Sequence, residues 1–154
     1  MGEKVMGYRF GSVFETALRY LILLSKGTEL SAIRLAEYDY IATYAHDFGL
    51  SESNLHGSGN YRSIEYAARL SGCDASVKYL VNRGFATVVH DTDGIRYKIS
   101  DNGRIFCSRM GSVYAVDYKI AADLVIENYG SINENALGKL ILNHNSAMVE
   151  GVNE

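Results

Sequence analysis

The histidines and their acidic neighbours are the first residues whose types could support chemistry. His46 and Asp47 are adjacent, and His56 follows in a nearby segment dense in Ser, Asn and Gly. Histidine binds metals and transfers protons near neutral pH, so these three residues suggest a metal or acid–base site. Ligand pairs on one helix face need a spacing of three or four residues, whereas adjacent residues point in different directions. We therefore interpret His46 as a helix-terminal histidine and Asp47 as a solvated carboxylate, and we predict no metal site.

Motifs for nucleophilic or phosphate chemistry are missing from the sequence. No serine lies in a G-x-S-x-G elbow, and Cys73 and Cys107 stand far apart without a recognisable His or Asn context. The glycine-rich stretch at 57–60 (GSGN) lacks the G-K-[ST] ending of a phosphate-binding loop. The sequence therefore predicts a protein that is not an enzyme, binds no cofactor and has no small-molecule substrate. We expect both cysteines to be reduced and buried.

Net charge argues against a dedicated nucleic-acid binder. The chain carries a formal charge of -3, and affinity for a duplex depends on cations that displace counterions from the phosphates. A basic patch could form only locally, on the helical segment between Ser63 and Arg83 and on the β-hairpin predicted after it. The tip of that hairpin carries two carboxylates. The candidate contacts to nucleic acid are Arg62, Arg69, Lys78, Arg83 and Arg96. We expect contact with DNA only within a larger complex.

Tyrosine is unusually frequent, with twelve residues in a chain that has no tryptophan and no proline. A tyrosine ring with its polar tip suits protein interfaces that are wet on one side, although most tyrosines of a small domain line its core. The candidate partner-binding residues are Tyr38, Tyr61, Tyr66, Tyr114 and Tyr118.

Apolar spacing predicts the elements that would position these residues. Ser12 and Glu15 form a capping box before a first helix, and a second helix should run from about 31 to 46, with Ile33 and Ile41 facing inward. After a loop at 49–60, helical spacing resumes between Ser63 and Arg83. Gly72 interrupts that segment, so one bent helix and two short helices are both compatible with it.

The segment 77–106 is the most informative part of the chain. A helix ends at Gly84, an apolar strand follows, and Asp93-Gly94 is a tight hairpin signal. Ile95, Tyr97 and Ile99 then alternate with basic residues, as in a half-buried strand, and Ser100 caps another helix. This order predicts a mainly α fold with a small β-hairpin, namely a winged-helix domain with additional N- and C-terminal helices.

Domain bounds follow from the same patterns. We predict an N-terminal segment at 1–11, a single winged-helix-like domain at 12–142, and a flexible C-terminal tail at 143–154 that lacks apolar periodicity. Helices are expected at 112–128 and 132–142. The predicted core residues are Leu18, Leu21, Ile41, Leu80, Val81, Ile95 and Tyr97. The longest apolar run, at 20–24, is far shorter than the ~20 residues that cross a bilayer, so we expect a soluble, cytoplasmic protein without membrane contact.

Short motifs spread over residues 14–125 carry a family resemblance. They are Leu18-Arg19-x-Leu21-x-Leu23-Leu24, Arg34-Leu35, Asp39-Tyr40-Ile41, Asp47, Asn54-Leu55-His56-Gly57, Asp93-Gly94-Ile95-x-Tyr97 and Tyr114-Ala115. Together they resemble the small middle component of ABC-three-component systems, which are bacterial anti-phage defence operons of the Lamassu type. The family's proline-rich loops around the Leu-His pair have no counterpart here.

The resemblance implies a non-catalytic bridging subunit. Such a subunit would link an ABC ATPase similar to the chromosome-maintenance (SMC) proteins to an effector such as a nuclease. The alternative from the residues alone is a winged-helix DNA-binding transcriptional regulator, which would bind a palindrome as a homodimer. A fold by itself does not choose between these functions.

Overall fold

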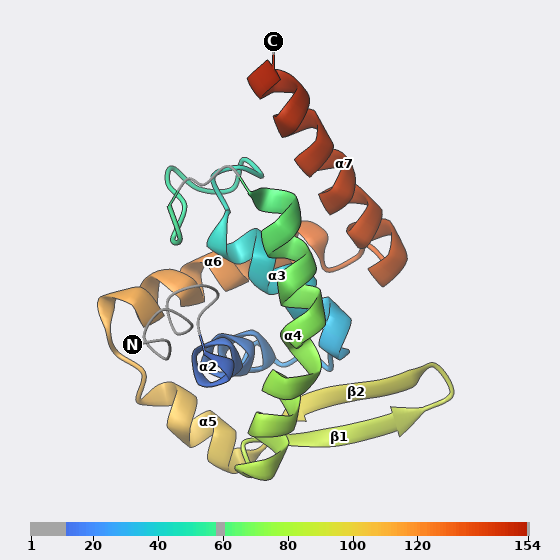
Figure 1. Ribbon diagram of the computed structural model, residues 1–154. Helices are drawn as coiled ribbons and strands as arrows, with labels where there is room; N and C mark the ends of the chain where they lie inside the picture. Colours follow the sequence, from blue (N-terminus) through green and yellow to red (C-terminus); the bar gives the residue numbers. More distant parts are fainter. Residues whose placement is uncertain (1–11, 58–60, 154) are drawn as a thin grey trace, which may run out of the picture.

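The computed structural model describes residues 12–57 and 61–153, so the predicted N-terminal segment at 1–11 lies outside the described residues. Its elements are α2 (Val13–Leu24), α3 (Ala32–Thr43), α4 (Arg62–Asn82), β1 (Ala86–Asp91), β2 (Gly94–Ile99), α5 (Asp101–Ser108), α6 (Val113–Tyr129) and α7 (Glu134–Asn153), shown in Figure 1. The prediction of a mainly α fold with a small β-hairpin is confirmed.

Serine hydroxyls set the first turn of four helices. Ser12, Ser31, Ser100 and Ser112 each accept a hydrogen bond from the backbone N–H three residues later, at the starts of α2, α3, α5 and α6. A side-chain oxygen at this position satisfies one of the N–H groups that a helix start leaves free. The caps predicted at Ser12 and Ser100 are therefore present.

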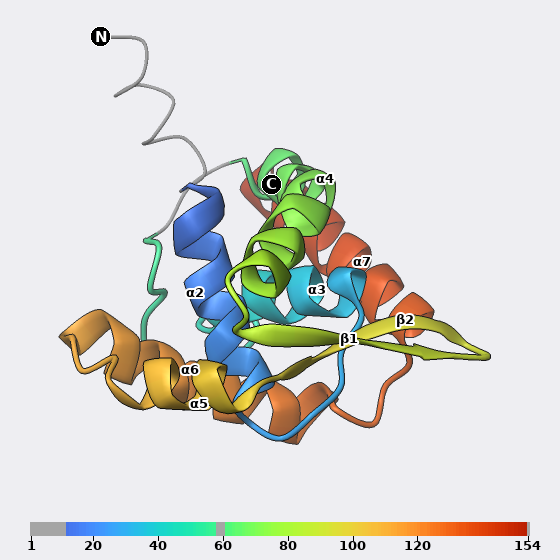
Figure 2. The same cartoon turned by 90° about the horizontal axis from the view of Figure 1, so that it is seen from below.

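Helix α3 is the centre of the fold. It lies between α4 on one side and α6 on the other, as Figures 1 and 2 show from two directions. Every residue from Arg34 to Thr43 is buried, including four that are polar or charged. Ile33, which was predicted to face inward, is instead 47% exposed, because it lies in the first turn before the helix enters the core.

Helix α4 is one continuous helix of 21 residues. Gly72 lies within it and does not interrupt it, and no atom lies near the position of an added Cβ. The helix ends at Arg83, where Gly84 takes a positive φ of 75° and leads into β1. The two cysteines are free and buried, as expected.

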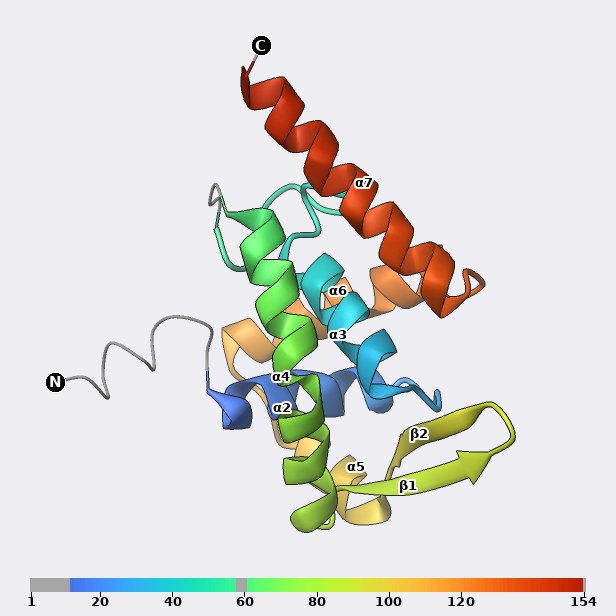
Figure 3. The same cartoon turned by 45° about the vertical axis from the view of Figure 1, so that its right-hand side comes forward.

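The hairpin projects from the helical body (Figures 1 and 3). The strands are antiparallel, with Ala86 opposite Ile99 at the base and Asp91 opposite Gly94 at the tip. Gly94 has the expected positive φ, at 124°. Ile95 was predicted to be a core residue but is 50% exposed, since it lies one residue from the tip of the projecting hairpin.

A single bridge joins the hairpin to the chain before α3. Leu30 pairs with Tyr97 of β2 through two backbone hydrogen bonds, of 3.0 and 2.8 Å. Leu30 is buried, and this bridge ties the middle of β2 to the segment that leads into the central helix. Leu21, Ile41 and Leu80 are fully buried core residues, as predicted.

The C-terminal region differs from its predicted form. Residues from Asn143 onward were expected to be a flexible tail, but α7 continues without a break to Asn153 (Figure 3). Ile141 and Asn145 are buried, and the Asn145 Oδ1 accepts a hydrogen bond of 2.9 Å from the Tyr40 hydroxyl. His144 stacks on Phe48 with ring centroids 4.2 Å apart. Polar and aromatic contacts therefore anchor this part of α7, which explains why apolar periodicity did not reveal it.

Helix α6 presents apolar residues on two opposite faces. Tyr118, Ala122 and Val125 are fully buried, whereas Val113 and Ile120 are 80% and 57% exposed. Within residues 12–57 and 61–153, none of the helices has the length and hydropathy needed to span a bilayer.

Candidate functional site

Asp39 is the centre of a buried ion-pair network. Its carboxylate is wholly buried and accepts hydrogen bonds from Arg19 Nε at 2.8 Å and Arg19 Nη2 at 3.2 Å. The Tyr118 hydroxyl donates to the same carboxylate at 2.6 Å, and Arg69 Nη1 lies 3.4 Å away. Burial alone would raise the pKa of Asp39, but the two guanidinium groups and the hydrogen bonds hold it below its ordinary value. The network thereby joins α2, α3, α4 and α6.

Arg69 connects this buried pair to the protein surface. Its Nη1 donates to Thr43 Oγ1 at 2.5 Å and to the Asp39 carbonyl oxygen at 3.1 Å, and its Nη2 donates to Glu65 Oε1 at 2.9 Å. Glu65 in turn accepts a hydrogen bond from the Tyr44 hydroxyl. The Arg69 side chain is only 8% exposed, so its donors serve the fold.

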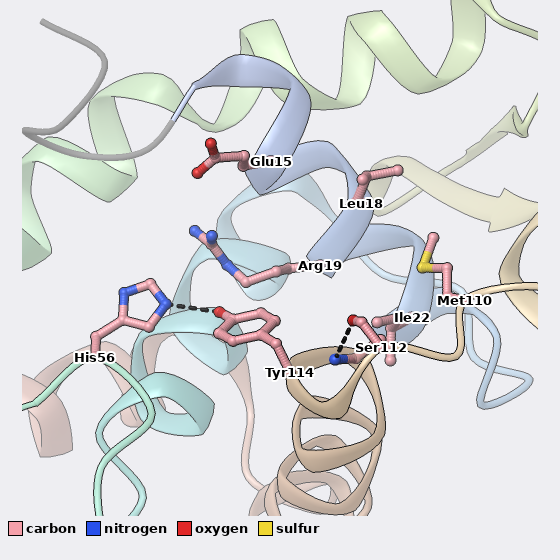
Figure 4. A pocket seen from close by; sticks show the side chains of 9 residues that line it. Glu15, Leu18, Arg19, Ile22, His56, Met110, Ser112 and Tyr114 are labelled. Atoms are coloured by element: carbon pink, nitrogen blue, oxygen red, sulfur yellow. Dashed lines mark hydrogen bonds between the residues drawn. The ribbon is translucent and has the colours of Figure 1, made fainter. Parts of the chain in front are cut away.

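A pocket of about 410 Å³ opens beside the network (Figure 4). Glu15, Arg19 and His56 lie toward one end of it, and Leu18, Ile22 and Met110 toward the other. Arg19 forms part of the wall, but its charge is already neutralised by Asp39. Among the described residues, the lining of the pocket is therefore mainly apolar and includes no free cation to hold an anionic ligand.

His56 and Tyr114 form a hydrogen-bonded pair at the mouth of this pocket, 2.6 Å apart (Figure 4). Although His56 is exposed as a residue, its ring packs against the rings of Tyr44 and Tyr114. This desolvation, together with the nearby Arg19 and Arg69, lowers the pKa of His56 to about 4. Burial also raises the pKa of Tyr114. Both groups are neutral at pH 7, so the pair acts as a polar contact between the loop and α6.

A second cluster holds the loop after α3. Asp47 Oδ2 accepts from Arg62 Nε at 2.7 Å, and Asp47 Oδ1 accepts from Asn54 Nδ2 at 2.9 Å. The Arg62 guanidinium carbon lies 3.9 Å from the Tyr44 ring centroid. Asp47 was predicted to be solvated, but its side chain is only 9% exposed. Within residues 12–57 and 61–153 no cluster of three or more His, Cys, Asp or Glu side chains is arranged to hold a metal ion.

Glu37 is another buried ionisable residue of α3, and its carboxyl group is less well satisfied. It is 2% exposed, and its Oε1 has no hydrogen-bond partner among the described residues. A Cβ at Gly138 of α7 would lie 3.0 Å from its other carboxylate oxygen, so the glycine gives the carboxyl its space. Burial and the neighbouring Glu134 raise the pKa of Glu37 to about 8.

The five tyrosines predicted to bind partners occupy different environments. Tyr38, Tyr66 and Tyr118 are 2%, 3% and 0% exposed, so they belong to the core. Tyr61 is 72% exposed and Tyr114 is 40% exposed. Only these last two present enough ring surface to meet a partner without a change in the fold.

The five cations predicted to contact nucleic acid are also divided. Arg62 and Arg69 are held by internal carboxylates, as described above. Lys78 and Arg83 are exposed on α4, and Arg96 of the hairpin pairs with Asp91 at 3.0 Å and with Asp93 at 3.4 Å. The structure therefore does not gather these residues into one open basic surface.

The Asp39 network was not predicted as a site from residue types alone. Arg19 and Asp39 were noted only in separate motifs of the family resemblance, whereas His56 was weighed as a metal or acid–base residue and Tyr114 as a partner-binding residue. The structure brings these four residues together around one pocket and the network beneath it. Their separation along the chain, from position 19 to position 114, hides this proximity in the sequence.

Fold and site together define a small, mainly helical protein whose most distinctive polar residues stabilise its own architecture. Residues 9–150 match the model of the family described as ABC-three component (ABC-3C) system Middle Component 2. The chain belongs to this family and is thus a middle component of an ABC-three-component anti-phage system. Comparison with curated proteins and with solved structures gives no match.

Proposed function

We propose that the protein is a non-catalytic bridging subunit of a Lamassu-type complex. It would link an SMC-like ABC ATPase to an effector such as a nuclease, in the cytoplasm. Membership of a middle-component family supports this role most strongly, because that family belongs to multi-subunit systems.

The placement of charged residues favours protein partners over direct binding of DNA. Two of the five candidate cations, Arg62 and Arg69, are used inside the fold, and the hairpin cation Arg96 is paired with the acidic tip. Since duplex affinity depends on cations free to replace counterions, the isolated protein should bind DNA weakly. Contact with DNA would then come through the assembled complex.

The rival function is a winged-helix transcriptional regulator. One observation favours it: α4, β1, β2 and α5 follow one another in the order of a winged helix, with Leu30 adding a bridge to the second strand. Lys78 and Arg83 lie exposed on the helix that would enter the major groove. In the bridging proposal the same helices and hairpin serve as a scaffold for partner proteins.

Two measurements separate these functions. Co-expression with the other two components of its system should yield a co-purifying complex if the protein is a bridging subunit. Fluorescence anisotropy with random and operon-upstream duplexes at ~150 mM salt should show weak binding without sequence preference, whereas specific regulators reach roughly 10⁻⁸ M or tighter. Binding of one operator at that strength, without co-purification, would establish the regulator instead.

A further inference from the structure

Helix α6 carries an exposed apolar row that the fold does not use. Val113, Val116 and Ile120 are 80%, 46% and 57% exposed and follow one another at spacings of three and four residues. Residues so spaced share one face of a helix, here along about 10 Å of its length. The buried face of α6 already supplies its contacts to the core, so this outward row needs another explanation.

A hollow lies beside the outward row. It has a volume of about 280 Å³ and lies between α6 and the loop after α3, with Leu55, Ile120 and Leu124 among its walls. Small-molecule sites occupy about 300–1,000 Å³, so this hollow is at or below the lower limit for a ligand site. Ser51, Ser53 and Asp117 also line it, so its size and its position beside the row suit one side chain that reaches over Ile120 from a neighbouring helix.

The charges around the row are acidic. Asp117 and Glu127 are exposed on the same helix, and Glu52 is exposed on the adjoining loop. Asp123 of α6 is also exposed, but it pairs with Lys26 at 2.9 Å. The one basic residue of α6, Lys119, directs its ammonium group to the carbonyl oxygens of Cys107 and Met110, at 3.2 and 3.0 Å. An apolar row with acidic flanks is therefore what α6 presents to an approaching partner.

We propose that this face of α6 docks an amphipathic helix of a partner subunit, with apolar residues along its contact face and Lys or Arg residues at its flanks. Helices pack when apolar rows interdigitate, and basic flanks would complement Asp117 and Glu127. A second copy of this chain is a poor occupant, because two acidic faces would meet. The inference rests on the proposed function, since a bridging subunit must have partner subunits to hold.

Cross-linking in the assembled complex identifies the occupant. A photoreactive amino acid is placed at Val116, the full chain is co-expressed with the other two components, and the cross-linked peptide is identified by mass spectrometry. The expected product is a segment with apolar residues at helical spacing and neighbouring Lys or Arg. A cross-link to a second copy of this chain or to an acidic segment, or no cross-link in an intact complex, would overturn the proposal.

Charge substitutions test the same face by affinity. V116K combined with I120K should lower the affinity of the chain for its partner subunit at least tenfold, and Asp117→Lys should weaken it as well. Ile105→Lys on α5 and Ile64→Lys on α4 are matched controls, since these residues are 51% and 63% exposed, and they should change affinity by less than twofold. Because all these positions are exposed, circular dichroism and the thermal midpoint should stay at wild-type values.

The outcomes separate the two proposals. Normal assembly of the V116K/I120K variant would exclude the α6 face and leave the bridging role intact. Failure of the wild-type chain to assemble with either component would overturn both proposals, because no partner helix would then exist. Loss of binding by the Ile64 and Ile105 controls to the same extent would show that the effect is not specific to α6, and would also overturn the inference.

Discussion

Replacing Asp39 by asparagine should destabilise the protein strongly. The substitution keeps the side-chain size but removes the only charge that faces both Arg19 and Arg69, and the wholly buried position excludes water from taking its place. Removing one partner of a buried ion pair costs about 3–5 kcal/mol, because the remaining charge is left unpaired. For a domain of this size, each kcal/mol lowers the thermal midpoint by about 2–4 °C, so the expected drop is roughly 6–20 °C.

Thermal and urea unfolding followed by circular dichroism measure this effect. Asp123→Asn is the matched control, because the same chemical change there removes a surface pair with Lys26, in which the Asp123 side chain is 62% exposed. Exposed pairs contribute about 0–1 kcal/mol, so this control should unfold close to the wild type. Equal stability of the Asp39 and Asp123 variants would refute the view that the network is essential to the fold.

The pH dependence gives an independent check on Asp39. Its pKa is held below the ordinary value of about 3.9, so the folded state favours the carboxylate. The stabilisation is therefore fully present above pH ~4 and is lost as the pH falls through the lower pKa of the folded state. The gap in unfolding free energy between wild type and Asp39→Asn should stay constant from about pH 5 to 8 and narrow only below about pH 4.

Four further substitutions test other parts of the fold. Burial raises the pKa of Glu37 to about 8, so the folded protein keeps a proton that the unfolded chain releases. The free energy of unfolding should therefore fall as the pH rises from about 4.5 to 8. Urea unfolding of Glu37→Gln should show a flatter pH dependence than that of the wild type. Gly103→Ala should lower the thermal midpoint, because the added Cβ would lie 2.1 Å from the Phe85 carbonyl oxygen. Gly72→Ala is the matched control: its Cβ would stand in open space within α4, so it should raise the free energy of unfolding by about 0.4–1 kcal/mol. Leu21→Asp should abolish cooperative unfolding because it places an unpaired charge at a fully buried position; a cooperative transition would contradict the core assignment.

Much of the local structure could be predicted from the sequence because it depends on neighbouring residues. The Ser12 and Ser100 caps and the turn at Gly94 each follow from one or two residue types with a fixed backbone preference. The apolar spacing of α2 was likewise sufficient to place Leu21 in the core.

Features that depend on distant contacts could not be predicted in this way. The C-terminal half of α7 is anchored by Asn145 and His144, whose partners Tyr40 and Phe48 lie about a hundred residues earlier in the chain. Apolar spacing in α6 identified a helix but could not say which of its two apolar faces was buried. Arg69 looked like a surface cation, because nothing local shows that Asp39 of α3 lies against it.

Reconstitution from purified components tests the bridging role most directly. Sedimentation velocity compares mixtures of the ABC ATPase and the effector of the same system with and without this protein. The bridging role predicts a complex of all three that depends on this protein, with no stable association of ATPase and effector in its absence. A stable complex of ATPase and effector that forms equally well without it, or that excludes it, would contradict the proposed function.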